Sequence, residues 1–234
     1  MTVGDWVIVA KPTMASFLPE NAGDMAAFLE TARYSSSSIP QLEAYLDEQV
    51  ASGTHDFEAN LALLKLYLMF PEAQDVARIG MILKKAVAAL PEPLLLQCRY
   101  LVPKALIKAQ DDVAKTISLG KLIEGGRYEQ FWTEGGEEFC DSMTGLRQGV
   151  SNAILGCMAR GYTSIQVDRV AAALNVSEAE IPAALEASPV EGEIRDGALK
   201  FTATERTRKQ NNDTTSELQS VNTLLKELMP LARV

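Results

Sequence analysis

The chain has 234 residues, of which 47% are hydrophobic and 23% are charged, a balance typical of globular proteins. This length is long for one domain and short for two full ones. The formal net charge of −9 argues against broad non-specific binding to nucleic acid and to anionic membranes, because both require an excess of Lys and Arg. The composition therefore favours a soluble protein whose partners are proteins, and predicts neither a DNA nor a membrane partner.

The three cysteines, Cys98, Cys140 and Cys157, are expected to be free thiols, since their number is odd and none is paired at the spacing of a metal or redox site. Free thiols are typical of a reducing compartment. The apolar run at residues 6–10 is too short to span a bilayer, and Asp5 rather than a basic segment precedes it, so it is a poor signal peptide. A cytoplasmic location is predicted.

The first predicted helices lie between residues 24 and 53. One is short and covers residues 24–34. The next is expected to begin with Ser38 as N-cap and Gln41 at the reciprocal capping position, and to end at Gly53.

The segment from Asp56 to Pro71 is predicted to form the central helix, around which the others are organised. Pro71 ends it, because proline has no N–H to donate. The helix is apolar around most of its circumference, so it should be buried on more than one side. Its predicted inner face carries Phe57, Leu61, Leu64 and Leu68. Its clearly polar positions are Glu58, Asn60 and Lys65.

More helices follow as far as residue 144, joined by short turns. Asp75 opens one that is expected to turn Lys84 and Lys85 outward. Pro103 must kink or split the helical stretch at residues 94–110. The glycine pairs at 125–126 and 135–136 separate the last segments. This pattern, with no convincing strand and no strict repeat period, predicts stacked helical pairs in a short α-solenoid.

The character of the sequence changes near Gly145. A helix beginning at Leu146 is followed by one at residues 165–174, capped by Thr163 or Ser164. A capping box at residues 177–180 opens a third helix. The pair Asp196-Gly197 between two short apolar-polar runs then predicts a hairpin. Three helices followed by a hairpin are the order of a winged helix.

The C-terminal segment begins with a locally basic stretch and ends in a predicted helix. The basic residues Arg206, Arg208 and Lys209 could contact RNA or belong to a solvated linker. The helix has the three-and-four spacing of a heptad seam, which could pack on the body of the protein or on a partner. Its seam residues are Leu218, Val221, Leu225 and Leu228. The predicted parts are an extension (1–22), a helical-repeat domain (23–144), a winged-helix domain (145–204), and a linker with the C-terminal helix (205–234).

A mostly α-helical, HEAT-like repeat domain followed by a winged helix with a small β-hairpin resembles the PCI architecture. Scaffold subunits of the proteasome lid, the signalosome and eukaryotic translation initiation factor 3 share that module. Residues 56–67 (DFEANLALLKLY) closely resemble the hallmark of the family of subunit k of initiation factor 3. Further segments fall in family order: residues 119–124, Tyr128, Phe131 and Trp132, residues 143–145, and residues 162–168. The similarity covers roughly residues 25–228.

The resemblance implies a non-catalytic scaffold subunit, without cofactors, acting in translation initiation. Its chief partner would be the l subunit of the same factor, in an assembly that binds the small ribosomal subunit. The residues agree with a non-enzymatic role. His55 is the only histidine, which excludes a multi-histidine metal site. The acidic pairs at 111–112 and 137–138 occupy adjacent positions and do not share a helix face, so solvated helix ends are expected.

A winged helix raises the alternative of a nucleic-acid-binding regulator. The candidate recognition helix at residues 177–187 carries Glu178, Glu180 and Glu186 and no Lys or Arg, which argues against insertion into a DNA groove. A protein–protein role is therefore favoured, and a scaffold subunit of another PCI complex remains the other alternative. The first predicted partner interface is the second strand of the hairpin, interpreted as a sheet edge. It comprises Ala198, Leu199, Lys200, Phe201 and Thr202. The heptad seam of the last helix is the second.

Overall fold

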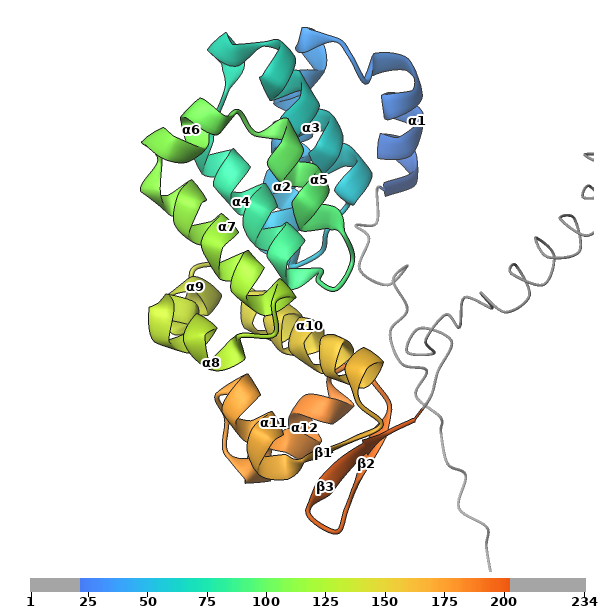
Figure 1. Ribbon diagram of the computed structural model, residues 1–234. Helices are drawn as coiled ribbons and strands as arrows, with labels where there is room; N and C mark the ends of the chain where they lie inside the picture. The colour runs from blue at the N-terminus through green and yellow to red at the C-terminus, as the bar shows by residue number, and fades with distance from the viewer. Residues whose placement is uncertain (1–21, 203–234) are drawn as a thin grey trace, which may run out of the picture. The chain divides into compact units, whose positions relative to one another are not determined.

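The computed structural model describes residues 22–202, which form a series of helices followed by a small antiparallel sheet (Figure 1). The predicted fold class, a helical domain followed by a winged helix, is confirmed. Residues 1–21 and 203–234 lie outside the described residues, and the predictions made for them stay predictions. These concern most of the extension, the basic residues Arg206, Arg208 and Lys209, and the final helix with Leu218, Val221, Leu225 and Leu228.

The central helices of the first part each pack on several helices that are near them in sequence. Helix α4 contacts α2, α3, α5 and α7, and α3 contacts α1, α2, α4 and α5. The helices are α1 (Ala22–Ala32), α2 (Ile39–Ser52), α3 (Phe57–Met69), α4 (Val76–Ala88), α5 (Leu94–Leu101), α6 (Lys104–Ala109), α7 (Asp111–Glu124), α8 (Tyr128–Phe131) and α9 (Glu137–Asp141). Short turns of other helix types are η2 (Ser36–Ser38), η3 (Pro71–Ala73) and η4 (Trp132–Gly136).

The second part is a winged helix built on α10. Its elements are α10 (Leu146–Gly161), β1 (Ser164–Gln166), α11 (Val167–Leu174), η5 (Glu178–Glu180), α12 (Ile181–Glu186), β2 (Gly192–Arg195) and β3 (Ala198–Phe201). The predicted hairpin turn is present: Asp196 and Gly197 have φ angles of 55° and 72°, the left-handed values that a tight hairpin turn requires.

Helix α3 begins and ends where the sequence predicts, but its buried face differs from the predicted one. The Asp56 carboxylate accepts a hydrogen bond from the Ala59 N–H, and the helix ends before Pro71. Leu63 and Leu66 are fully buried, whereas Leu68 is 44% exposed. Asn60, expected at a polar position, is buried. A helix that is apolar nearly all round does not reveal from its own sequence which side its neighbours cover.

The local predictions for Pro103 and for the ends of α2 can be compared with the structure. Pro103 does split its stretch, into α5 and α6. Ser38 occupies the N-cap position of α2 as predicted, but it has helical backbone angles and its side chain makes no capping hydrogen bond. Its hydroxyl instead donates to the Ala32 carbonyl oxygen at 2.7 Å, which ties the start of α2 to α1. Gly53 ends α2 with a φ of 69°, as expected.

The sheet corrects two predictions about the winged helix. Residues 164–166 form β1 rather than a helix cap, and α11 begins only at Val167. The strand order is β1-β3-β2, with β3 antiparallel to both neighbours, so Ile165 and Ile194 both pair with Leu199. The interpretation of residues 198–202 as a sheet edge is therefore wrong: both sides of β3 are occupied. The edges are β1 and β2.

Helix α10 joins the two parts. It packs on α4 and α9 on one side and on α11 on the other, and Figure 1 shows it between the two groups of elements. A Cβ at Gly149 would lie 2.5 Å from the Cβ of Ala88 in α4, so only glycine permits this close approach. Buried residues of both parts form one continuous core. A domain boundary at residue 145 stays a prediction.

None of the helices between residues 22 and 202 combines the length and the hydrophobicity needed to cross a membrane.

Candidate interaction surfaces

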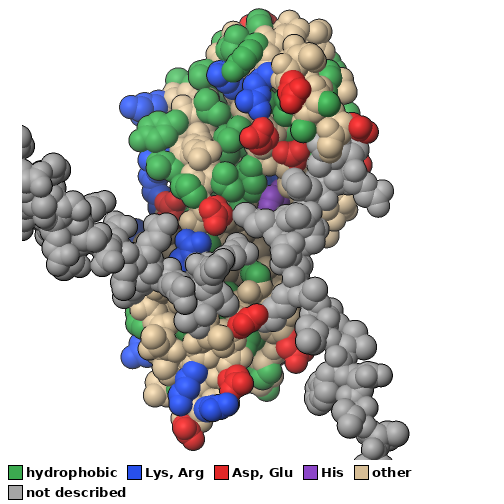
Figure 2. Space-filling view, turned by 90° about the vertical axis from the view of Figure 1, so that its right-hand side faces the viewer, with side chains coloured by type: hydrophobic (Ala, Val, Ile, Leu, Met, Phe, Trp, Pro, Cys, Tyr) green, Lys and Arg blue, Asp and Glu red, His purple; other side chains and the backbone are tan. Residues whose placement is uncertain are grey.

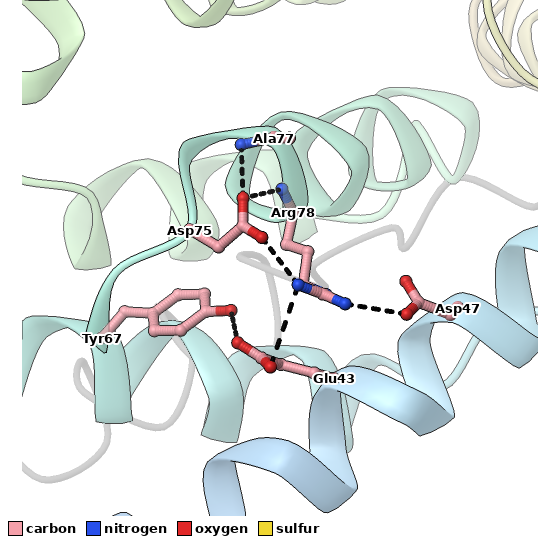
Figure 3. Close-up of polar contacts among 6 residues, drawn as sticks. All are labelled: Glu43, Asp47, Tyr67, Asp75, Ala77 and Arg78. Atoms are coloured by element: carbon pink, nitrogen blue, oxygen red, sulfur yellow. Dashed lines mark hydrogen bonds and ion pairs between the residues drawn. The ribbon is translucent and has the colours of Figure 1, made fainter.

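A charged cluster centred on Arg78 ties α2 to the start of α4 (Figure 3). The two terminal nitrogens of its guanidinium lie 2.8 Å from the Asp47 carboxylate and 2.6 Å from that of Asp75. Glu43 lies 3.8 Å away and accepts a hydrogen bond from the Tyr67 hydroxyl at 2.7 Å. The hydrogen bond that the Arg78 guanidinium donates to Asp47 is the largest cause that raises the Arg78 pKa. Burial, followed by the hydrogen bond to Glu43, raises the pKa of Tyr67.

A second cation of α4, Lys85, is buried and has no carboxylate in an ion pair with it among the described residues. Its ammonium donates to the carbonyl oxygens of Gln49 at 3.0 Å and Thr54 at 2.6 Å, at the C-terminal end of α2. Such carbonyls lack partners within their helix and carry partial negative charge. Burial lowers the Lys85 pKa to about 8. The expectation that Lys85 points outward is wrong.

Buried polar side chains continue this arrangement between α2 and α3. The Gln49 amide exchanges hydrogen bonds with the Asn60 amide at 3.2 and 3.1 Å, and its oxygen also accepts from the Asp56 backbone N–H. The Tyr45 hydroxyl donates to Asp56. Asn60 is the sequence signal that could have revealed this network, since it is a polar residue on the largely apolar helix α3. Every one of these contacts joins helices, so the network is structural.

The residues weighed for catalysis or metal binding do not come together. Burial raises the pKa of the Cys98 thiol to about 12 and that of Cys140 to about 11, which keeps both in the inert protonated form. His55 is half-buried, and burial followed by the nearby Lys85 charge lowers its pKa to about 4. Within residues 22–202 there is no group of three His, Cys, Asp or Glu side chains that could hold a metal.

Exposed apolar side chains concentrate on α3 and α5, which pack against each other. Leu68 and Met69 at the end of α3 are 44% and 48% exposed, and Leu96 and Tyr100 on α5 are 41% and 77% exposed. Figure 2 shows hydrophobic side chains gathered on the helical part between groups of charged ones. We call these four residues the α3–α5 face. Large exposed apolar side chains on neighbouring helices are typical of protein interaction sites.

The corner of the winged helix that would face DNA is acidic. The capping box is formed as predicted: the Glu180 carboxylate accepts hydrogen bonds from the Ser177 N–H and hydroxyl, and these lower its pKa. Neither η5 nor α12 contains a Lys or Arg. A shallow depression beside the wing is lined by Asp168, Glu178 and exposed Ile194. This surface has the wrong charge to approach phosphates.

Comparison with known proteins places the sequence. The model of the CSN8/PSMD8/EIF3K family matches residues 76–188, from α4 to just beyond α12. The Xenopus tropicalis protein named "Eukaryotic translation initiation factor 3 subunit K" is 30% identical over 160 residues, which cover 67% of this chain and 71% of that protein. The chain belongs to the family of initiation factor 3 subunit K.

Other subunit K proteins agree. The Homo sapiens protein is 30% identical over 139 residues, covering 58% of this chain and 62% of that protein. The Dictyostelium discoideum protein is 27% identical over 146 residues, covering 62% and 59%. The resemblance to the subunit k family that was drawn from the sequence is confirmed.

The structure of this subunit K relative locates the predicted partner strand, although nothing tests its role. Ala198 and Leu199 are buried, Phe201 is half-buried, and only Lys200 and Thr202 are exposed. Because β3 lies in the middle of the sheet, its backbone is not free to add a partner strand. The other predicted site residues, at positions 206–228, fall outside the part that the structure describes. The α3–α5 face was missed, because Leu68 was assigned to the core.

Proposed function

We propose that this chain is a non-catalytic scaffold subunit of initiation factor 3, which acts in the cytoplasm through protein–protein contacts. Its chief partner is the l subunit, within the assembly that binds the small ribosomal subunit. Membership of the subunit K family supports the proposal that the chain is part of initiation factor 3. The polar clusters support a structural role, because their side chains bind one another or the backbone across α2, α3 and α4 rather than opening into a catalytic pocket.

The observation that carries the proposal is the α3–α5 face. Four large apolar side chains, each at least 41% exposed, lie on two neighbouring helices of a chain with a net charge of −9. Burying apolar surface contributes about 25 cal/mol per Å², so a partner that covers such a face gains affinity from it. A solvated face would more commonly be polar.

The winged helix offers a second contact, through the edge strand β2 rather than through β3. Glu193, Ile194 and Arg195 are all exposed, and Ile194 presents 40% of its surface. The outer edge of β2 has no sheet partner among residues 22–202. The strand is short and charged, features that discourage uncontrolled strand addition. A selective contact by a matched partner strand is compatible with both features.

Affinity capture of the tagged full-length chain from its own cytosol, at low and high salt, tests the proposal. Recovery of factor 3 subunits, led by the l subunit and persisting at high salt, is the expected result. Recovery of proteasome-lid or signalosome subunits instead would overturn the assignment to factor 3. Recovery of nucleic acid without these proteins would favour the alternative of a nucleic-acid-binding regulator.

Two variants locate the contact. Leu96→Asp with Tyr100→Asp places two carboxylates on the α3–α5 face and should reduce capture of the l subunit about tenfold or more. The matched control adds two carboxylates to exposed positions of α2, Gln41→Asp with Ala51→Asp, and should leave capture unchanged. Ile194→Asp tests the β2 edge separately. Equal capture by all variants, each melting cooperatively, would contradict a role for both surfaces.

A further inference from the structure

A groove of about 580 Å³ lies where the α7–α8 turn meets the winged helix. One wall comes from the α7–α8 turn and the start of α8, and the other from the end of α10, β1 and α11. Its volume falls within the range of about 300–1,000 Å³ that is common for ligand sites. Buried Met158 and half-buried Ile165 and Tyr128 give it an apolar floor. Tyr162, which is 57% exposed, and Arg127 and Arg169 stand at its rim.

The groove is formed before any partner arrives, because hydrogen bonds hold its walls together. The Trp132 indole N–H donates to the Ala173 carbonyl oxygen of α11 at 2.8 Å. The Asn175 amide donates to the Glu137 carboxylate, also at 2.8 Å. On the opposite side, the Arg127 backbone N–H donates to the Leu122 carbonyl oxygen at 2.8 Å and fixes the turn after α7. A preformed site saves the entropy that ordering would cost on binding.

The two arginines at the rim are available. Among residues 22–202, neither Arg127 nor Arg169 has a side-chain hydrogen bond or ion pair, although the chain carries an excess of acidic residues. Most other arginines in this range are paired with carboxylates. These are Arg33, Arg78, Arg147, Arg160 and Arg195. One unpaired guanidinium on each wall, against the single carboxylate of Glu129, makes the groove locally cationic.

We infer that this groove binds a short acidic segment of another factor 3 subunit, with a carboxylate held by Arg127 and Arg169 and an adjacent aromatic or aliphatic side chain on the Met158–Ile165 floor. Guanidinium groups bind carboxylates through paired, charge-assisted hydrogen bonds. The apolar floor supplies the contact that a carboxylate alone would lack. The inference rests on the proposed function for the identity of the occupant.

A peptide fits these features better than RNA does. Tyrosines beside arginines could stack on bases. However, RNA affinity depends on the neutralisation of several successive phosphates. The groove has two cations, Glu129 lies in its lining, and the chain as a whole repels a polyanion. One or two carboxylates on a peptide match two guanidiniums without that repulsion.

Site-specific photo-crosslinking in the assembled complex identifies the occupant. The Tyr162→p-benzoylphenylalanine variant of the full chain places the probe at the rim, and the same substitution at Tyr34 is the control. The expected result is a crosslink from position 162 to one segment of a factor 3 subunit that contains Asp or Glu beside an aromatic or aliphatic residue. Crosslinks to RNA, to a segment without acidic residues, or to nothing would each overturn the inference.

Binding measurements then test the charges. The crosslinked segment, made as a peptide, should bind Arg127→Glu with Arg169→Glu at least about tenfold more weakly than it binds the wild-type chain. Replacing its acidic residues by Lys should restore binding to that variant. Lys104→Glu with Lys108→Glu, an equal charge change at exposed positions of α6, should have little effect. Equal binding by both double variants would overturn the inference.

The two proposals fail in different ways. If the wild-type chain captures no factor 3 subunit, the proposed function fails and the inference fails with it. If the wild-type chain and Arg127→Glu with Arg169→Glu assemble alike, and the peptide binds both alike, only the groove is excluded.

Discussion

Two cations on one face of α4 meet α2 in opposite ways. Arg78 and Lys85 are seven residues apart, which is two helical turns, so both side chains turn toward the same neighbour. Arg78 lies at the edge, with its side chain 26% exposed, and contacts three carboxylates. Lys85 lies inside and contacts two backbone carbonyl oxygens. Their pKa values shift in opposite directions: that of Arg78 rises and that of Lys85 falls.

The difference separates two uses of a positive charge. At the edge, water still screens Arg78, and its carboxylates offset the charge, so the cluster fastens α2 to α4 at modest energy. In the interior, Lys85 donates to carbonyl oxygens at the end of α2 that would otherwise lack partners. Its charge is removed from water, and no carboxylate among residues 22–202 pairs with it. Four measurements test this contrast.

Lys85→Ala should have the largest effect. It removes the donor to one buried and one partly buried carbonyl oxygen and leaves a cavity, so we expect the free energy of unfolding to fall by about 2–4 kcal/mol. Urea denaturation measures it. The neighbouring Lys84→Ala is the matched control and should change stability by no more than about 0.5 kcal/mol. Equal losses for the two variants would show that Lys85 is not held as described.

Alkaline pH should reveal the buried ammonium. The unfolded chain keeps the Lys85 proton up to the ordinary pKa of 10.5, whereas the folded chain releases it near 8. Between these values the unfolded state binds more protons, so this residue makes the protein more stable as pH rises. Relative to Lys85→Met, the wild-type chain should gain up to about 3 kcal/mol across this window. A constant difference from pH 7.5 to 10.5 would contradict the burial of a charged Lys85.

Arg78→Ala should cost less, about 1–2 kcal/mol at low salt, because it leaves three carboxylates near one another without a cation. Raising the salt concentration to 1 M should reduce this loss, since the cluster is partly exposed and screened. The loss for Lys85→Ala should not change with salt. Denaturation of both variants at 0.05 and 1 M NaCl makes the comparison, and the same salt response in both would remove the distinction.

Tyr67→Phe should have the smallest effect of the four, a loss of about 1 kcal/mol. It removes the hydrogen bond to Glu43 without creating a cavity, and Glu43 keeps Arg78 as a partner. Combining it with Arg78→Ala tests coupling, because the double variant should lose more than the two single losses together. Strict additivity in thermal or urea unfolding would mean that the hydroxyl acts independently of the cluster.

The same contrast explains what could be predicted from the sequence. Asp56, Asp75 and Pro103 act on their own backbone, and each begins, caps or splits its helix as predicted. Lys85 could not be placed from local sequence, since its neighbour Lys84 suggested a solvated face and its partners lie 31 and 36 residues away. Helix propensity depends on the residue and its own helix, whereas burial depends on which other helix packs against it.

The candidate surfaces follow the same rule. The hairpin was found from Asp196 and Gly197, which determine a local turn. The third strand was not, because Ser164–Gln166 is three residues long and is a strand only through pairing with β3. That pairing moved β3 from the edge to the centre of the sheet. The Arg127–Arg169 groove likewise joins residues 42 positions apart and had no local signal.

The contact between Gly149 and Ala88 affects how the two candidate binding surfaces are positioned for a partner. Two small residues set the spacing between α10 and α4, and α10 carries the winged helix. The pair therefore sets how closely the helical part, which bears the α3–α5 face, packs on the helix that carries the winged helix and its β2 edge. A larger residue at position 149 would leave every side chain of both surfaces intact and yet misalign them. A partner that binds both surfaces would have to distort its own fold to fit the misaligned arrangement.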